Sequence, residues 1–159
     1  MAAAILIGEY PRALDARYRL SLPPEFTPAL AAGDGALVLA KERPGCVSLW
    51  PAAVWKPKHE AVLEVLRTKI DAGLLARRTP FVQELGRLLS TRHREVRLAG
   101  RDRLVVPEGF REFLGVAPGG DLLVVGAAVC VELWQPSAWG AFIAEAMPGF
   151  STRLDELAG

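Results

Sequence analysis

Short runs of alternating apolar and polar residues occur along much of the chain, and this period of two predicts β-strands joined by tight turns. The runs Leu20–Leu22 and Leu104–Val106 each lead into a proline, which cannot continue a strand ladder. The apolar runs Ala36–Ala40 and Leu122–Val125 lie too close to glycine or proline for helices. They are therefore predicted as buried strands.

Each of these buried strands is followed by a turn and a second apolar run, Cys46–Trp50 or Val129–Trp134. The two pairs of runs predict two β-hairpins. Between the alternating strands and the hairpins, phenylalanine and leucine recur at a spacing of four, which places each pair on one helix face. Short helices are predicted over Pro24–Ala31 and Glu108–Leu114.

Three further stretches, residues 51–74, 81–89 and 136–147, carry apolar residues at helical spacing. In the first of them Pro57 is expected to place the true start of the helix near Lys58. The second stretch predicts that the segment between the two hairpin regions is structured.

The same pattern occurs twice, because residues 14–55 recur at 98–139 with a constant offset of 84 and no gap. The matching pairs of cysteines and tryptophans are Cys46/Cys130, Trp50/Trp134 and Trp55/Trp139. A unit of about 42 residues rarely closes a core alone. The copies are therefore expected to fold against each other or against other subunits.

Composition restricts the partners and the compartment. The chain has 159 residues, of which 51% are hydrophobic, and its net charge of +1 means that an anionic partner must be held by local arginine clusters. Two short stretches supply these clusters, with Arg12, Arg17 and Arg19 in one and Arg92, Arg94, Arg97, Arg101 and Arg103 in the other.

The two cysteines lie in apolar runs and are expected to be buried and reduced, with an inter-repeat disulfide as the less favoured alternative. The absence of a signal-like or membrane-length apolar run predicts a cytoplasmic protein.

Four segments carry a family resemblance: Gly8-Glu9-Tyr10, Leu14–Pro23, Arg103–Pro107 and Val131–Trp134. Together they resemble the MraZ family of bacterial transcriptional regulators, which have two AbrB-like (SpoVT-AbrB) modules in each chain. The resemblance implies an α+β fold of tandem, pseudo-twofold AbrB-like swapped-hairpin β modules with flanking helices. It also implies that subunits close into a ring-shaped homo-oligomer.

Residue ranges follow from this resemblance. Module 1 is expected at 5–55, a helical connector at 56–91, and module 2 with a C-terminal helix at 92–146. Residues 147–159 contain helix breakers and are expected to form a frayed tail.

The resemblance also implies the partner. In this family the Asp-x-x-x-Arg segments lie together on one surface and contact short repeated DNA sites. Those sites lie upstream of the division and cell wall gene cluster that includes the protein's own gene. A sequence-specific, nucleoid-associated regulator, and specifically a repressor acting on double-stranded promoter repeats, is expected. No cofactor, membrane or small-molecule substrate is implied.

The first Asp-x-x-x-Arg motif is formed by Asp15 and Arg19, with Tyr18 where the family usually has glycine. An arginine fork can bind two phosphate oxygens or the O6 and N7 atoms of guanine. A carboxylate four residues earlier in a turn can accept hydrogen bonds from the guanidinium or from loop N–H groups and hold the fork in one orientation. Asp15 is thus predicted to orient Arg19, with Arg17 contacting phosphate.

The second motif departs from the family pattern. Arg103 is present and Arg101 matches Arg17, but Ala99 stands in place of the aspartate and Asp102 in place of the glycine. Asp102 could orient an arginine from a different position, or it could repel the DNA backbone.

Other interpretations carry less support. A rival hypothesis keeps the ring but makes it a non-catalytic assembly protein with degenerate loops. An antitoxin would need a disordered toxin-binding tail. An enzyme is not expected, because there is no glycine-rich phosphate loop and Ser21 lacks histidine and aspartate partners. His59 and His93 form no metal set with the cysteines, and the tryptophans are expected in the core or in subunit interfaces rather than stacked on bases.

Overall fold

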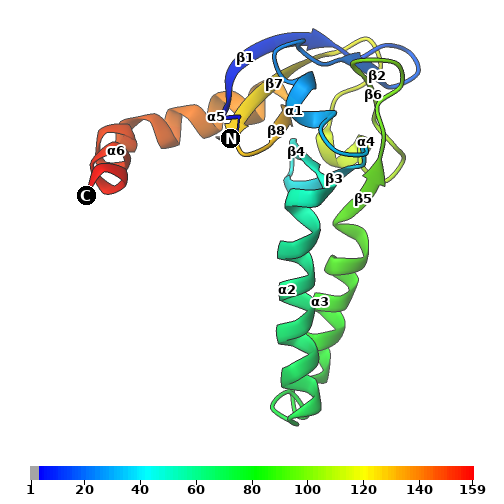
Figure 1. Ribbon diagram of the computed structural model, residues 1–159, viewed down its shortest axis with the longest axis vertical. Helices are drawn as coiled ribbons and strands as arrows, with labels where there is room; N and C mark the ends of the chain where they lie inside the picture. The colour runs from blue at the N-terminus through cyan, green and yellow to red at the C-terminus, as the bar shows by residue number, and fades with distance from the viewer. Residues whose placement is uncertain (1–3) are drawn as a thin grey trace.

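The computed structural model describes residues 4–159 and shows a β-body from which two helical projections extend in different directions (Figure 1). The fold is α+β, as expected, with a six-stranded antiparallel sheet and a separate two-stranded ribbon. In spatial order the sheet strands are β1 (Leu6–Ala13), β7 (Asp121–Ala128), β8 (Val131–Trp134), β4 (Cys46–Pro51), β3 (Leu37–Arg43) and β5 (His93–Val96). The ribbon pairs β2 (Arg19–Ser21) with β6 (Arg103–Val105). Both predicted hairpins, β3–β4 and β7–β8, are confirmed.

The strand pairing follows the sequence repeat. Ser48 lies opposite Glu132 where β4 meets β8, and Leu20 lies opposite Leu104 in the ribbon. Both pairs are separated by the repeat offset, so the two halves are related by a pseudo-twofold axis passing between these residues. Strand β1 from the first half pairs with β7 of the second, and β5 from the second half pairs with β3 of the first. Each half therefore completes its sheet with a strand of the other.

The two edge strands β1 and β5 were missed by the apolar-run pattern, and their composition explains why. Strand β1 contains Pro11, which is tolerated at a sheet edge because its missing N–H is not needed there. Strand β5 is His93–Val96, with two exposed charged residues in its middle. Neither segment has the continuous apolar character of a central strand.

The core contains equivalent residues from both repeats. The fully or nearly fully buried members are Leu20, Leu22, Phe26, Leu30 and, from the second repeat, Leu104, Val106, Phe110 and Leu114. The short helices that contribute to it, α1 (Thr27–Leu30) and α4 (Arg111–Leu114), are one turn long and shorter than predicted. In both repeats a hydrogen-bonded turn separates the proline from the helix, with Phe26 N–H donating to Pro23 O at 3.0 Å in the first. The proline ends the strand without starting the helix.

Helices α2 (Ala52–Asp71) and α3 (Thr79–Thr91) form the longer projection. The predicted helix start near Lys58 is wrong, because α2 begins at Ala52 and contains Pro57. Packing explains the difference: Trp55 is buried against Ala36 and Val38 of the first half. This contact holds the first turn of the helix although Pro57 supplies no N–H to bond to the preceding turn.

The second projection, called here the C-terminal arm, consists of α5 (Pro136–Ala146), a 3₁₀ turn (Met147–Gly149) and α6 (Phe150–Ala158). The expected frayed tail is helical in the structure. The base of the arm is fixed to the body, since Trp139 and Phe142 pack on the buried Trp134 at ring-centroid distances of 5.1 Å. The Trp139 indole N–H also donates to Glu9 Oε1 at 2.8 Å.

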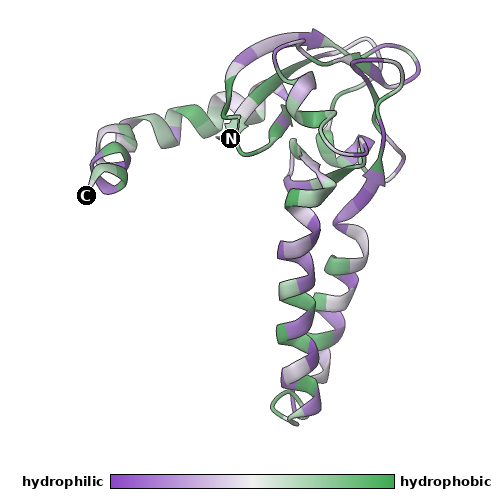
Figure 2. Cartoon of the chain, viewed as in Figure 1, coloured by the Kyte–Doolittle hydropathy of each residue, from purple (hydrophilic) through white to green (hydrophobic). Residues whose placement is uncertain are grey.

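Both cysteines are buried and free, which confirms the expected core role. None of the helices formed by residues 4–159 combines the length and apolarity needed to cross a lipid bilayer. Hydrophilic and hydrophobic residues instead alternate along the helices of both projections (Figure 2).

Candidate nucleic-acid interface

The β2–β6 ribbon places the two predicted arginine motifs side by side. Leu20 and Leu104 point into the core, so the alternation of a strand turns Arg19 and Arg103 to the opposite, outer face. Arg19 lies opposite Val105, and Arg103 lies opposite Ser21. The two arginines are thus diagonal neighbours on one face, a relation that separates Cα atoms by roughly 7–8 Å in an antiparallel pair.

Asp15 organises the loop before β2. Its Oδ1 atom accepts hydrogen bonds from the backbone N–H groups of Arg17 at 2.8 Å and Arg19 at 2.9 Å. Its Oδ2 atom accepts one from Arg19 Nε at 2.8 Å. The pKa of Asp15 is lowered, chiefly by the backbone N–H of Arg19. One carboxylate therefore holds both the turn and the guanidinium of Arg19, and its role in presenting that guanidinium to DNA stays a prediction.

The Nε atom of Arg19 faces Asp15, and its side chain remains 35% exposed. Beside it the surface is hollowed by about 210 Å³, and the lining includes Asp15, Arg19, Ser21 and Arg103. Arg12 of β1 braces this region by donating from Nε to Ser21 O at 3.0 Å. The hollow thus joins residues from both repeats in one polar depression.

The backbone conformation of Tyr18 fits the glycine that the family resemblance implies at this position. Its φ angle of +59° lies in the left-handed region, which costs a residue with a Cβ about 1–2 kcal/mol. The backbone is held there because Tyr18 O accepts a hydrogen bond from Val106 N–H at 2.8 Å. Arg111 lies over the tyrosine ring with its Cζ 3.9 Å from the centroid, and this cation–π contact contributes about 0.5–1 kcal/mol.

The sequence does not identify Arg12 or Arg111 as site residues. Arg12 belongs to an arginine cluster, but nothing in its spacing identifies Ser21 as its partner. Arg111 has no counterpart in the repeat, because the equivalent residue is Thr27. Its role follows only from the fold, which places α4 beside the loop of the other half.

The loop before β6 keeps the backbone of its counterpart but lacks its carboxylate. Ala99 N–H donates to Arg103 O at 2.7 Å, as Asp15 N–H does to Arg19 O at 2.9 Å. Within residues 4–159 the side chains of Arg101, Arg103 and Asp102 form no hydrogen bond or ion pair. Asp102 therefore does not replace the missing orienter, and both arginines project without a fixed partner.

Two other arginines of the second cluster, Arg92 and Arg97, are engaged elsewhere, and Arg94 lies over the Phe110 ring with its Cζ 5.9 Å from the centroid. Arg92 lies 3.6 Å from a carboxylate oxygen of Glu42, and Arg97 donates to Asp34 O at 2.7 Å. These side chains support the β5 edge and the loop before β3. The free guanidinium groups of the ribbon region are consequently those of Arg17, Arg101 and Arg103, beside the oriented Arg19.

Other candidate chemistry has no comparable geometry. His59 and His93 are close, with ring centroids 4.6 Å apart, but they pack on Trp55. Among the described residues no group of three histidine, cysteine or acidic side chains is arranged to hold a metal ion. Trp55 and Trp134 are buried, as expected for core residues. What the ribbon region offers is one oriented guanidinium, that of Arg19, beside the three free ones of Arg17, Arg101 and Arg103, which suits the acceptor edge of guanine and phosphate oxygens.

Comparison with known proteins finds curated relatives that carry the same name, although no protein-family profile matches the chain. The chain is 34% identical to the transcriptional regulator MraZ of Methylobacillus flagellatus over 92% of each protein, and 32% identical to that of Deinococcus radiodurans over 86% of each. It is 27% identical to the transcriptional regulator MraZ of Thermus thermophilus over 88% of each.

Proposed function

The chain belongs to the MraZ family, and we propose that it is a DNA-binding transcriptional regulator whose β2–β6 ribbon contacts double-stranded DNA. Arg19, oriented by Asp15, reads a base edge, and Arg17 contacts phosphate. Arg101 and Arg103 add contacts from the second repeat. The protein is not an enzyme in this proposal.

One observation carries the proposal. The fold makes Arg19 and Arg103 diagonal neighbours on the outer face of a ribbon whose inner leucines are buried. Residues separated by 84 positions in the chain thus become parts of one arginine-bearing surface. The hydrogen bonds of Asp15 further restrict Arg19 to one orientation, which base recognition requires and phosphate attraction alone does not.

Self-assembly into a ring is part of the proposal, because one subunit has few cationic contacts. Each repeat contributes two arginines and one aspartate to the ribbon region, and the whole chain has a net charge of only +1. Each phosphate contact contributes a salt-dependent increment through counterion release. Linked copies on tandem DNA sites raise avidity by roughly 10²–10⁴ without any new contact.

The finer assignment follows the family resemblance. We propose tandem AbrB-like swapped-hairpin modules, with module 1 at 5–55, a connector at 56–91, and module 2 at 92–146 followed by the tail at 147–159. The exchanged pairings of β1 with β7 and β5 with β3 support this assignment. The DNA target is a set of promoter repeats upstream of a division and cell wall gene cluster that includes the protein's own gene, with repression as the outcome and the nucleoid as the location.

A second function is favoured by Ala99. Without a carboxylate there, Arg103 is not oriented, and a surface with one degenerate loop suits a ring that holds a protein partner rather than DNA. This alternative predicts the same fold and assembly. It differs in predicting that substitution of Arg19 leaves retention of DNA unchanged.

Gel retardation across a salt series tests the proposal, with DNA from upstream of the protein's own gene against random competitor. Arg19→Ala should raise the Kd for the specific DNA by about 5- to 150-fold, the equivalent of one base contact of about 1–3 kcal/mol. Arg103→Ala should lower the magnitude of the slope of log K against log salt by about 1, the change expected when one phosphate contact is lost. The matched control is Arg87→Ala, which removes an exposed arginine of α3. The proposal fails if the wild type never retains the specific DNA more strongly than the competitor.

A further inference from the structure

A group of basic side chains surrounds α4, on one side of the ribbon. It consists of Lys41 of β3, Arg94 of β5 and Arg111 of α4, and is called here the α4 flank. Lys41 Nζ lies 5.2 Å from the centroid of the Phe110 ring, and Arg94 Cζ lies 5.9 Å from the same centroid. Two neighbouring strands of the sheet thus direct their cations to the residue that precedes α4.

Strand pairing places these cations on the same side of the sheet as the ribbon. Lys41 lies opposite Val47, and Arg94 lies opposite Leu39. Directly opposite residues of an antiparallel pair share a face of the sheet. Val47 and Leu39 belong to the core that Leu20 of the ribbon also lines. The α4 flank therefore faces the ribbon side, whereas the aromatic anchors of both helical projections pack on the other side of the sheet.

The acidic side chains of the same two strands are turned away from the flank. Glu42 of β3 accepts a hydrogen bond from the Ser48 hydroxyl, and Glu95 of β5 pairs with a lysine of α2 at 3.3 Å. Both contacts lie on the opposite face of the sheet. Among residues 4–159 no flank cation forms an ion pair with a carboxylate, and this includes Glu108 and Glu112 beside α4. The three cations therefore remain available to an external anion.

Arg111 connects the flank to the ribbon. It covers the Tyr18 ring, and its Nε donates to Val106 O at 2.9 Å. Its Nη groups form no hydrogen bond within the part of the chain that the structure describes. Because Tyr18 directly follows Arg17 in the ribbon loop, the basic surface continues from that loop through Arg111 to the two strand cations.

The pseudo-twofold counterpart of the flank lacks these charges. The equivalent residues in the other half are Tyr10 for Arg94, Gly126 for Lys41 and Thr27 for Arg111. Gly126 is matched by pairing, since it lies opposite Val131 as Lys41 lies opposite the repeat-related Val47. Arg12 lies over Tyr10, but it donates to the carbonyl oxygens of Pro11 and Ser21. The three flank cations are therefore specific to one side of the ribbon.

We propose that the α4 flank binds the phosphate backbone of DNA on one side of the base pairs that the ribbon contacts. Phosphate contacts fix the position of a protein on the duplex but carry no sequence information. The inference rests on the proposed function and extends its contact surface. An acidic protein segment is the competing partner. Continuity with the ribbon favours DNA, because one polyanion can then contact both surfaces.

Charge-neutral substitutions test the contact with full-length protein. Lys41→Gln and Arg94→Gln each remove one cation, and each should lower the magnitude of the slope of log K against log salt by about 1. Arg111→Gln should change the slope by the same amount. The probes are a duplex from upstream of the protein's own gene and a random duplex of equal length. For Lys41→Gln and Arg94→Gln the ratio of the two affinities should stay at the wild-type value.

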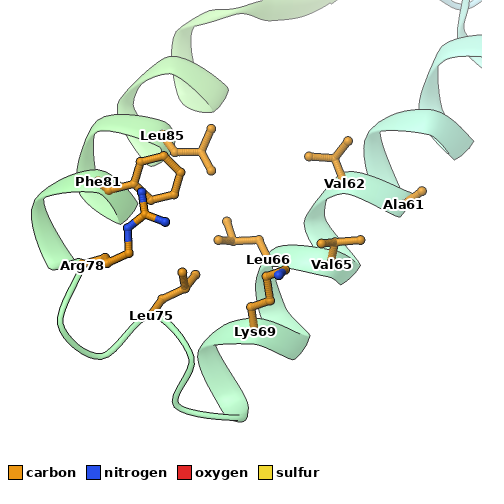
Figure 3. Close-up of a pocket in the computed structure, with 9 residues that line it drawn as sticks. All are labelled: Ala61, Val62, Val65, Leu66, Lys69, Leu75, Arg78, Phe81 and Leu85. Atoms are coloured by element: carbon orange, nitrogen blue, oxygen red, sulfur yellow. The ribbon is translucent and has the colours of Figure 1, made fainter.

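Two matched controls remove an arginine that also lies over an aromatic ring. Arg43→Gln acts on the opposite face of the sheet, where Arg43 Cζ lies 5.0 Å from the Phe142 centroid. Arg78→Gln acts on the α2–α3 hairpin, where Arg78 Cζ lies 4.2 Å from the Phe81 centroid (Figure 3). Exposed charges farther from the DNA than the Debye length of about 8–10 Å are largely screened. Both controls should therefore keep the wild-type slope.

Hydroxyl-radical footprinting on a duplex with one site locates the contact. The variant that carries both Lys41→Gln and Arg94→Gln should lose protection of the DNA backbone at one end of the site. Protection around the base pairs contacted by Arg19 should remain. Equal loss at both ends, or no loss at either end, overturns the one-sided contact.

Failure of the flank contact is distinguishable from failure of the proposed function. Slopes that stay at the wild-type value, or that fall equally in the controls, overturn the flank contact, and the proposed function stands if Arg19→Ala still lowers discrimination. A wild type that does not discriminate between the duplexes, but whose slope depends on Lys41 and Arg94, supports the flank contact and contradicts sequence recognition. A wild type that binds neither duplex overturns both proposals.

Discussion

Asp15→Asn separates the orientation of Arg19 from its charge. The carboxylate accepts three hydrogen bonds, two from backbone N–H groups and one from Arg19 Nε. An asparagine keeps the size of the side chain but has a single acceptor oxygen and an NH₂ group that donates. If the oxygen remains on the backbone, the NH₂ group opposes the guanidinium, and Arg19 is released.

The two consequences for DNA binding have opposite signs. Loss of orientation should lower discrimination between specific and random DNA by up to about 5- to 150-fold, which corresponds to one bidentate contact of about 1–3 kcal/mol. Removal of a negative charge beside the DNA should raise the affinity for random DNA and steepen its salt dependence. The ratio of the two affinities is therefore the informative quantity.

Fluorescence anisotropy with a specific and a random duplex, each over a salt series, measures this ratio. Asp102→Asn is the matched control, because it removes the same charge from the other loop at a side chain with no hydrogen bond among residues 4–159. The control should raise both affinities and leave the ratio unchanged. An unchanged ratio for Asp15→Asn would refute the orienting role of the carboxylate.

Three further predictions concern stability and reactivity. Leu20→Ala should lower the free energy of unfolding by about 2–5 kcal/mol in urea titrations, because the side chain is buried beneath the ribbon, and a loss below about 1 kcal/mol would contradict its core role. Burial and the neighbouring His59 lower the pKa of His93, so the unfolded chain binds the proton more readily. The contribution of neutral His93 to the free energy of unfolding should be fully present above the unfolded pKa of about 6.5 and should be lost as pH falls below it. His93→Gln should remove this pH dependence of stability. Burial raises the pKa of Cys130 to about 12 and that of Cys46 still further, so neither thiol should react with Ellman's reagent at pH 8 until urea unfolds the protein.

The internal repeat made much of the fold predictable. An apolar run in one copy was supported by its counterpart, so both hairpins and both ribbon strands were found. The edge strands β1 and β5 were not, because edge strands bury less and tolerate proline and charge. The start of α2 was missed for a related reason: the packing of Trp55 outweighs the local effect of Pro57.

The candidate site was likewise predictable from the sequence only in part. The spacing of Asp15 and Arg19 is local, and the hydrogen bonds between them could be predicted from the turn alone. The placement of Arg103 beside them depends on the pairing of β2 with β6, which the sequence suggested only through the family resemblance. The contact of Arg111 with Tyr18 joins different halves and breaks the repeat, so no local pattern reveals it.

Joining the two halves in one chain lets the two loops differ. A homodimer of identical halves would present the same loop twice and would favour a palindromic site, because the symmetry of an operator mirrors that of its protein. Here Asp15 orients one arginine, while Ala99 leaves its counterpart unrestrained. In the proposed complex the subunit would therefore have a direction along the DNA, and repeated subunits that share this direction would match non-palindromic sites arranged head to tail.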